Sequence, residues 1–423
     1  MSARKLEDTG DYEAARQAMG ELWQRIGERP NVEGLGRIMA GEVLLRAGVL
    51  VGIIGSKNQV TGAQETAKNL IGESLAIFES LHYGKKAAEA QIELALCYWR
   101  TGEHNEARDY LKEALSRLTT DSELKARALQ RLALVERDAA CFVDSLRILL
   151  DNAPLFEKIK NHMIKGSYHV TLADVLENLW ELEKKADYLD RAFIEYAAAS
   201  YHFEEAGHKP YRANVENNLG YLYFKVHKYK EAELHLDRAR QLLLNLKNYC
   251  SVAQVDETRA RLFLSEKRYA EAERVARSSV RLLDNGGQQG LLSEALIIHG
   301  RALVRLECYD QAYAALLRAV SIAQECGAVN RAGEAALIII EDLGEHLTFE
   351  KVKDAFQVSD LVELRQYEHE LIEKALIRAE GGISRAAHLL GTSHQHLARM
   401  LQGRHRDLLP LRTPAKSRPK RLK

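Results

Sequence analysis

The side chains best suited to chemistry in this sequence gather near its C-terminus. Glutamine and arginine carry paired hydrogen-bonding groups that match the edges of adenine and guanine in the DNA major groove, and serine, histidine and arginine can contact phosphate. The residues of these types that we take as candidate DNA contacts are Ser384, Arg385, Ser393, His394, Gln395, His396, Arg399, Gln402, Arg404 and Arg406.

Two short helices joined by a tight turn are predicted to hold these residues. Ala386 and Ala387 give the first helix a small, apolar face, which allows a neighbouring helix to approach closely. Gly391 follows at the point where a tight turn needs a residue that can take positive φ. Thr392 and Ser393 are suitable caps for a second helix that begins directly after them.

The second helix is predicted to have one apolar and one polar face. Leu397, Met400 and Leu401 recur at helical spacing and should pack inward. The residues left facing outward are His394, Gln395, Ala398, Arg399 and Gln402. A glycine turn between a small-residue helix and a helix with a polar outer face is typical of a helix-turn-helix that reads the major groove.

The stretch GGISRAAHLLGTSHQHLARML resembles the Fis-type helix-turn-helix found at the C-terminus of many bacterial transcription regulators. The positions that match are Ser384, Ala386, Ala387, Leu390, Gly391 and Leu397. The resemblance implies a sequence-specific regulator whose partner is double-stranded DNA. Members of this family commonly carry the module behind an ATPase, but no G-x-x-x-x-G-K-[ST] phosphate loop occurs in this chain, so activation by ATP hydrolysis is not implied.

Modules of the Fis type resemble dimeric readers, so a homodimer is expected. The helix that precedes the motif, predicted over residues 367–380, carries an apolar stripe that is the expected dimer seam. The stripe consists of Leu371, Ile372, Ala375, Leu376 and Ala379. Packing of the same stripe against the preceding part of the chain is the alternative.

Charge is distributed unevenly along a chain whose formal net charge is zero. Residues 399–423 contain nine Lys and Arg and one acid, so this end carries +8 and the rest carries −8. Pro410, Pro414 and Pro419 should keep the basic segment extended. The segment is predicted to bind phosphates without regard to sequence, and a solubilising extension is the alternative.

The composition favours an all-helical cytoplasmic protein. Ala, Leu, Glu, Arg and Lys are abundant across 423 residues, and only 6 are proline. The five cysteines lack a C-x-x-C pair and suit a reducing compartment. The most hydrophobic run, residues 47–55, is too short to span a bilayer. Because no metal-ligand, nucleophile or dinucleotide motif occurs, we expect neither an enzyme nor a bound metal or cofactor.

Most of the chain before residue 345 repeats one pattern: a small residue, a large one three later, and small or apolar residues twelve, sixteen and nineteen later. The clearest copies are Ala95, Tyr98, Ala107, Leu111, Ala114; Gly220, Tyr223, Ala232, Leu236, Ala239; Ala260, Phe263, Ala272, Ala276, Ser279; and Gly300, Leu303, Ala312, Leu316, Ala319. A weaker copy comprises Ala133, Glu136, Ser145, Leu149 and Asn152. Small residues at these positions let two antiparallel helices approach closely.

This pattern resembles the tetratricopeptide repeat (TPR), to whose consensus LGYLYFKVHKYKEAELHLDRA is close. The successive small anchors are Ala95, Ala133, Ala173, Gly220, Ala260 and Gly300. They lie 38 to 47 residues apart, against about 34 in the standard repeat, which predicts longer helices. Residues 10–23 are predicted to match the second helix of a pair, and residues 32–82 to form two long helices with a loop near 56–62. A peptide or protein partner is expected in the groove lined by first helices, contacted by Asn214, Asn217, Asn218, Tyr221, Arg261, Arg301 and Arg305.

The fold predicted from the sequence is all-α, with a TPR-like superhelix (solenoid) followed by a small helix-turn-helix. Residues 1–345 would form the array, and residues 346–366 a capping helix (349–356) and linker with a hinge near 357–360. Residues 367–403 would form the DNA-binding module, and 404–423 a flexible basic tail. The function predicted is a DNA-binding transcription regulator with a protein-interaction arm. The alternative is a non-enzymatic scaffold whose C-terminal module binds a protein.

Overall fold

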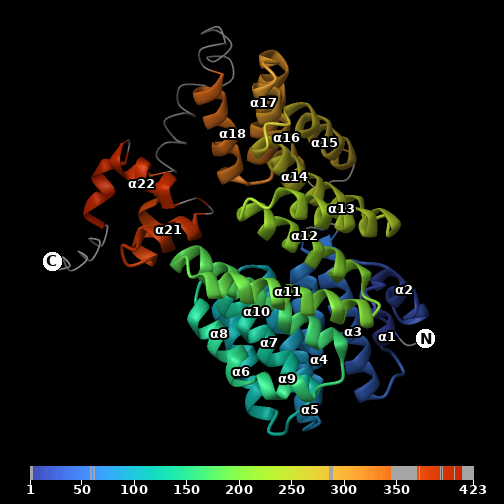
Figure 1. Ribbon diagram of the computed structural model, residues 1–423. Helices are drawn as coiled ribbons and strands as arrows, with labels where there is room; N and C mark the ends of the chain where they lie inside the picture. The colour runs from blue at the N-terminus through green and yellow to red at the C-terminus, as the bar shows by residue number, and fades with distance from the viewer. Residues whose placement is uncertain are drawn as a thin grey trace, which may run out of the picture. The chain divides into compact units, whose positions relative to one another are not determined.

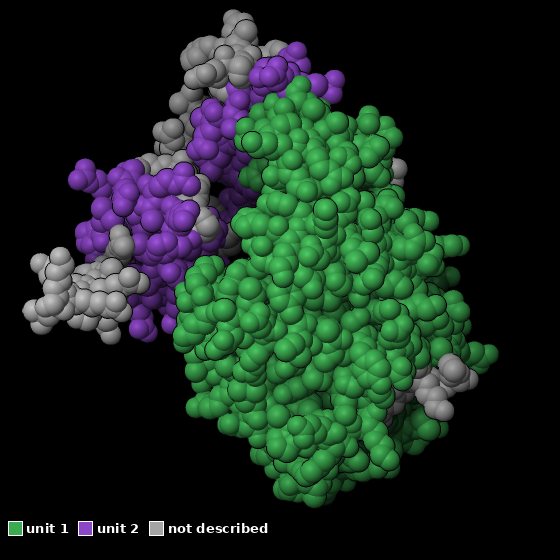
Figure 2. Space-filling model, viewed as in Figure 1, with its two compact units in different colours: residues 1–306 green, residues 307–423 purple. Residues whose placement is uncertain are grey.

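Helices and their connections account for the whole of the described structure, and no strand occurs among the described residues (Figure 1). The computed structural model describes residues 3–57, 60, 62–284, 289–343, 369–370, 372–390, 392, 394–403 and 405–411. The chain divides into two compact units, residues 1–306 and residues 307–423 (Figure 2). The prediction of an all-α, TPR-like fold is confirmed.

The first unit contains helices that pack as sequential antiparallel pairs. They are α1 (Ala3–Asp8), α2 (Tyr12–Gln17), the short 3₁₀ turn η1 (Gly20–Leu22), α3 (Arg37–Lys57), α4 (Ala63–Ser80), α5 (Gly84–Arg100), α6 (His104–Arg117), α7 (Glu123–Asp138), α8 (Phe142–Asp151), α9 (Ala153–Lys158), α10 (His162–Glu183), α11 (Ala186–Glu205), α12 (Lys209–Lys225), α13 (Tyr229–Asn245), α14 (Tyr249–Ser265), α15 (Tyr269–Leu283) and α16 (Gln289–Arg305). The second unit contains α17 (Tyr309–Glu325), α18 (Val329–Asp342), α21 (Ile383–Leu389), α22 (His394–Gln402) and the 3₁₀ helix η2 (Arg406–Leu411).

Long helices joined by short, uniform turns explain why the repeat is longer than the standard one. Helices α12, α13 and α14 each have 17 residues and are joined by three-residue turns. The middle residue of each turn adopts the left-handed conformation, at His227 (φ 61°), Lys247 (φ 52°) and Lys267 (φ 62°). The next amide then bonds back to the preceding helix, as Lys228 N does to Tyr223 O at 2.9 Å. The prediction of longer helices is confirmed, and the widest spacing falls where α10 and α11 reach 22 and 20 residues.

The predicted register of the repeat is confirmed at its small residues. Ala107, Ala232, Ala272 and Ala312 are fully buried. A Cβ atom added to Gly220 would lie 2.6 Å from Leu236 Cγ and 3.2 Å from the Ala232 carbonyl oxygen. Helices α12 and α13 therefore approach too closely at this point for any side chain but hydrogen.

The N-terminal region differs from its prediction in one respect. The helix expected within residues 10–23 is present as α2 and pairs with α1, but it is shorter than predicted, because α2 ends at Gln17 and Gly20 takes φ 59° in a 3₁₀ turn. The two long helices expected in residues 32–82 are confirmed as α3 and α4. Helix α3 is also apolar over a longer stretch than residues 47–55. The window Arg37–Ser56 is long and apolar enough to cross a membrane, but 72% of it is buried in this unit, as in the core helix of a globular domain.

The helix-turn-helix has its own hydrophobic core. Its buried members come from the helix of residues 372–378 and the turn that follows it, from α21 and α22, and from η2. They are Ile372, Ala375, Leu376, Ala379, Ile383, Ala386, Ala387, Leu397, Leu401 and Leu408. Leu390, Met400 and Leu409 pack against this group.

Two expectations about this region are corrected by that core. The stripe containing Ile372, Ala375, Leu376 and Ala379 is used within the module itself, so it is not available as a dimer seam. The extended chain expected at Pro410 is also wrong, since Arg406–Leu411 forms a 3₁₀ helix that buries Leu408. The fixed φ of proline is compatible with the dihedrals of a 3₁₀ turn.

Several predictions concern residues outside the described ones. They are the capping helix at 349–356, the linker at 346–366, the hinge near 357–360, the dimer-seam residue Leu371, and the tail after Leu411. The four domain boundaries therefore stay predictions. Within the described part, residues 405–411 pack on the helix-turn-helix, and we propose that the module continues to Leu411.

Candidate functional site

The polar face predicted for the second helix of the motif is exposed on α22. Gln395, Arg399 and Gln402 are exposed and recur at i, i+4 and i+7, so they form one strip along the helix. Leu397 and Leu401 are fully buried on the opposite face. This burial orients α22, because rotating the helix would expose two leucines at once.

Other members of the predicted DNA-contacting set have different positions. Ser384 and Arg385 are exposed in the first turn of α21, and Arg406 is exposed at the start of η2. His394 is exposed at the first position of α22 but shares a helical row with buried Leu397 and Leu401, so its exposure comes from the helix end. Ala398 is half-buried rather than outward. Ser393, Arg404 and the side chain of His396 lie outside the described residues.

Backbone and side-chain contacts fix the angle between the helices of the module. The helix containing residues 372–378 ends with Glu380 (φ 50°) and Gly381 (φ 77°), and Gly381 N bonds to Leu376 O at 2.9 Å. Thr392 N bonds to Ala387 O at 2.9 Å and closes the turn before α22. His369 makes two further contacts: its Nδ1 lies 3.1 Å from His405 Nδ1, and its Nε2 lies 3.1 Å from Asp407 Oδ2. No sequence pattern indicated these contacts.

The first compact unit, residues 1–306, contains a second candidate site, which is a cavity of about 770 Å³. Its wall comes mainly from the first helices of successive pairs, namely α5, α7, α10, α12, α14 and α16. Tyr12 of α2 and Glu7 of α1 also line it. The expectation that first helices form an inner surface therefore applies to this cavity, whose volume suits a drug-sized ligand.

Three of the predicted groove residues line the cavity and four do not. Asn214, Asn217 and Asn218 of α12 are part of its wall. Tyr221, Arg261, Arg301 and Arg305 are absent from that wall. Lys225 Nζ lies 4.3 Å from the centroid of the Tyr221 ring. Arg261 Nη2 lies 2.6 Å from Glu257 Oε1, with which it forms an ion pair. Arg301 and Arg305 are further along α16 than Glu294, its last lining residue. The binding role of all seven stays a prediction.

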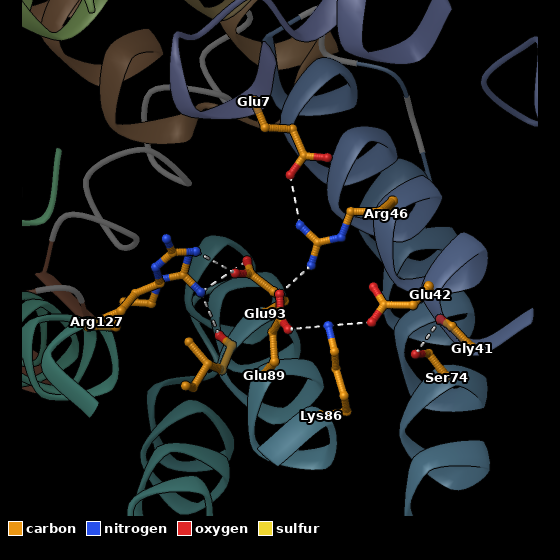
Figure 3. Close-up of polar contacts among 11 residues, drawn as sticks. Glu7, Gly41, Glu42, Arg46, Ser74, Lys86, Glu89, Glu93 and Arg127 are labelled. Atoms are coloured by element: carbon orange, nitrogen blue, oxygen red, sulfur yellow. Dashed lines mark hydrogen bonds and ion pairs between the residues drawn. The ribbon is translucent and has the colours of Figure 1, made fainter. Parts of the chain in front are cut away.

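Ion pairs join neighbouring helices and involve several residues that line the cavity (Figure 3). Arg46 of α3 donates to Glu7 Oε2 of α1 and to Glu89 Oε1 of α5, each at 2.8 Å. Glu93 Oε2 of α5 lies 3.0 Å from Arg131 Nη1 of α7. Burial alone would raise the pKa of Glu93, but Arg131, Arg127 and Arg46 together lower it to about 2. These buried charges are therefore compensated by one another.

Analysis of the sequence missed the arginines of this cavity. They are Arg46, Arg100, Arg127, Arg131 and Arg137. A readable signal existed in α7, because Arg127 and Arg131 are one helical turn apart on a first helix of a repeat. No signal marked Arg46 as part of a site, because it directly precedes the apolar run 47–55 of a core helix and is only 9% exposed.

Comparison with protein families agrees with both parts of the chain. The Fis family of bacterial regulatory proteins matches residues 363–402, and the tetratricopeptide repeat matches residues 88–117. The repeat match contains the copy from Ala95 to Ala114. The chain is thus a TPR protein with a C-terminal Fis-type helix-turn-helix of the DNA-binding kind, and neither matched family is enzymatic. No curated protein matches it.

Solved structures of similar fold include a protein with a TPR sensor. A signal transduction ATPase of the STAND class with a TPR sensor, from Pyrococcus horikoshii, matches with a TM-score of 0.58 and 14% identity, over 89% of this chain and 62% of that one. A Rap protein complexed with competence and sporulation factor matches with a TM-score of 0.54 and 15% identity, over 89% of this chain and 100% of that one. Apo RapI matches with a TM-score of 0.52 and 13% identity, over 87% and 99%. At these identities the likeness concerns the fold alone.

Proposed function

We propose that this protein is a sequence-specific, DNA-binding transcription regulator of the bacterial cytoplasm. The observation that carries the proposal is the exposed strip of Gln395, Arg399 and Gln402 on α22, opposite fully buried leucines, in a segment that matches the Fis family. In this proposal α22 lies in the major groove, where Arg399 pairs with guanine and Gln395 with adenine.

Phosphate contacts would fix the position of α22 on the duplex. The exposed Ser384 and Arg385 at the start of α21 and the exposed Arg406 of η2 are suited to this role. The basic residues after Leu411 would add contacts that do not depend on sequence. They are Arg412, Lys416, Arg418, Lys420, Arg421 and Lys423.

The repeat array would act as a sensor arm that binds a protein or peptide. Repeats of this kind present inner surfaces to extended partners, and the fold of this array is similar to that of a Rap protein whose structure contains competence and sporulation factor. A homodimer is also proposed, because one helix-turn-helix covers half of a symmetric site. Its contact surface must differ from the stripe that the module buries.

The decisive experiment is selection of duplexes from a random library by the full chain, followed by binding measurements over a range of salt concentrations. We expect one enriched motif and a steep fall in affinity with salt. Deleting residues 412–423 should weaken binding to enriched and scrambled duplexes by similar factors and flatten the salt dependence. Absence of any duplex binding would favour a scaffold whose C-terminal module binds a protein, and an unchanged salt slope would make the tail a solubilising extension.

A further inference from the structure

Arg100 differs from the other arginines of the cavity in having no polar partner. It is the last residue of α5, and no hydrogen bond or ion pair joins it to any described residue, whereas Arg46 and Arg131 are each held by carboxylates. An arginine that lines a cavity without a counter-ion is a ready partner for an anion, since its planar fork can donate two parallel hydrogen bonds to a carboxylate.

The surroundings of Arg100 leave space for its guanidinium. Gly52 of α3 lies beside it, and a Cβ atom added there would be 3.2 Å from Arg100 Nη1. Asn217 of α12 also lines the cavity, and its Oδ1 is buried and has no hydrogen-bond partner. A buried polar atom without a partner costs free energy that a ligand could recover by donating to it. The site therefore offers the unpaired guanidinium of Arg100 as a donor and Asn217 Oδ1 as an acceptor.

The balance of charge limits what can bind. The wall contains five arginines (Arg46, Arg100, Arg127, Arg131, Arg137) and four glutamates (Glu7, Glu93, Glu257, Glu294). The other four arginines are already paired with carboxylates inside or beside the wall. The single charge of Arg100 therefore fits a monoanion better than a phosphate dianion, which the nearby carboxylates would repel. Apolar side chains complete the wall close in sequence to Arg100, including Leu96 and Trp99, and favour a ligand with an apolar body.

We propose that this cavity binds a small organic monoanion, whose carboxylate pairs with Arg100 and whose body contacts the apolar wall. A free carboxylic acid and the C-terminus of a short peptide share this chemistry. The inference rests on the sensor role proposed for the repeat array and names the class of ligand, and none of the site's residues belongs to the helix-turn-helix.

The test uses the full chain and two pairs of probes. One pair is 4-phenylbutyrate and its amide, and the other is N-acetyl-trileucine as the free acid and as the amide. Binding is measured by saturation-transfer NMR and thermal shift at millimolar concentrations, in the absence of DNA. We expect at least one acid to bind saturably and its amide to bind at least tenfold more weakly, because the amide lacks the charge that pairs with Arg100.

Variants then assign the effect to the site. Arg100→Gln should weaken the acid at least tenfold, whereas Arg281→Gln, at an exposed arginine of α15 outside the cavity, should not. Tighter binding of the tripeptide acid would identify a peptide terminus, and tighter binding of 4-phenylbutyrate a free acid. If neither acid binds better than its amide, or if Arg100→Gln binds the acid as the parent does, the proposal is wrong. If Arg100→Gln fails to fold, the comparison of each acid with its amide on the parent protein still tests whether the protein binds a carboxylate.

Discussion

Arg399 occupies the middle of the exposed strip on α22, one turn from Gln395 and one turn from Gln402. Its backbone belongs to a helix that Leu397 and Leu401 hold against the module core. The position of its Cβ atom is therefore fixed in the DNA-free protein. An arginine presented in this way can make a bidentate contact to guanine at little further cost in ordering.

Arg399→Ala should therefore weaken binding to the selected site by about 1–3 kcal/mol and relax sequence preference at one base pair. The measurement is a set of binding isotherms on the selected site and its single-base variants. Lys374→Ala is the matched control, since this exposed cation lies on the helix of residues 372–378 rather than on α22. Equal affinity and equal preference in Arg399→Ala and the parent would exclude Arg399 from base reading.

His208 is a second residue with a measurable consequence, here for stability. It is fully buried against Gly10, its Nδ1 accepts a hydrogen bond from Tyr211 N at 3.2 Å, and its Nε2 has no partner. Burial lowers the pKa of His208 to about 4. Because this value lies below that of an unfolded histidine, about 6.5, the folded state binds the proton less readily than the unfolded state does.

The free energy of unfolding should accordingly lose roughly 1–3 kcal/mol from this group as pH falls from about 6.5 toward 4, with its full contribution present above pH 6.5. His208→Gln should flatten part of that dependence. Urea unfolding of the parent and the variant at pH 7.5, 6 and 5 measures the difference. His227→Gln, at an exposed histidine in the connection after α12, is the control and should keep the parental slope. Parallel pH profiles for His208→Gln and the parent would contradict the assignment.

At the scale of elements, the array is a set of helix pairs whose distance is set by small residues. Ala232 of α13 is fully buried, and its carbonyl oxygen lies beneath Gly220 of α12. Since each pair contacts mainly its neighbours, a local change in distance should disturb adjacent repeats without unfolding the helix-turn-helix.

Ala232→Leu should destabilise the array by about 1–3 kcal/mol through overpacking. Thermal melting followed by circular dichroism measures the loss. Glu231→Leu adds a side chain of the same kind at an exposed position of the same helix and should change stability little. A melting curve for Ala232→Leu that overlays the parental curve would show that this alanine does not set the distance.

At the scale of the whole molecule, we expect two copies of the chain to act together. A reader with one helix-turn-helix per chain gains affinity and symmetry by pairing, with the two recognition helices in successive major grooves roughly 34 Å apart. Among described residues of the module, Ile377 is 61% exposed while its neighbours Leu376 and Ala379 are buried. A dimer contact would have to use such exposed residues.

We expect light scattering at micromolar concentration to give twice the mass of one chain, and selection to return a two-fold symmetric site. Ile377→Lys tests the surface, because a charge at a dimer contact should produce monomers, whereas Leu234→Lys on the exposed face of α13 should not. A monomer that binds an asymmetric site tightly would rule out the dimer.

Local rules were enough to determine the fold class and the orientation of α22. Spacing at helical period separates Leu397 and Leu401 from Gln395 and Arg399, and small residues at fixed intervals identify the helix pairs, since both signals depend only on neighbours in sequence. The cavity could not be predicted, because Glu7, Arg46 and Arg100 meet there from three helices distant in sequence. The packing of η2 likewise depends on tertiary contacts, because Leu408 is buried in a core that it shares with α21, α22 and the helix of residues 372–378. Periodicity thus determined which face of a helix turns inward, and only the packed structure decided which distant charges became partners and which arginine was left without one.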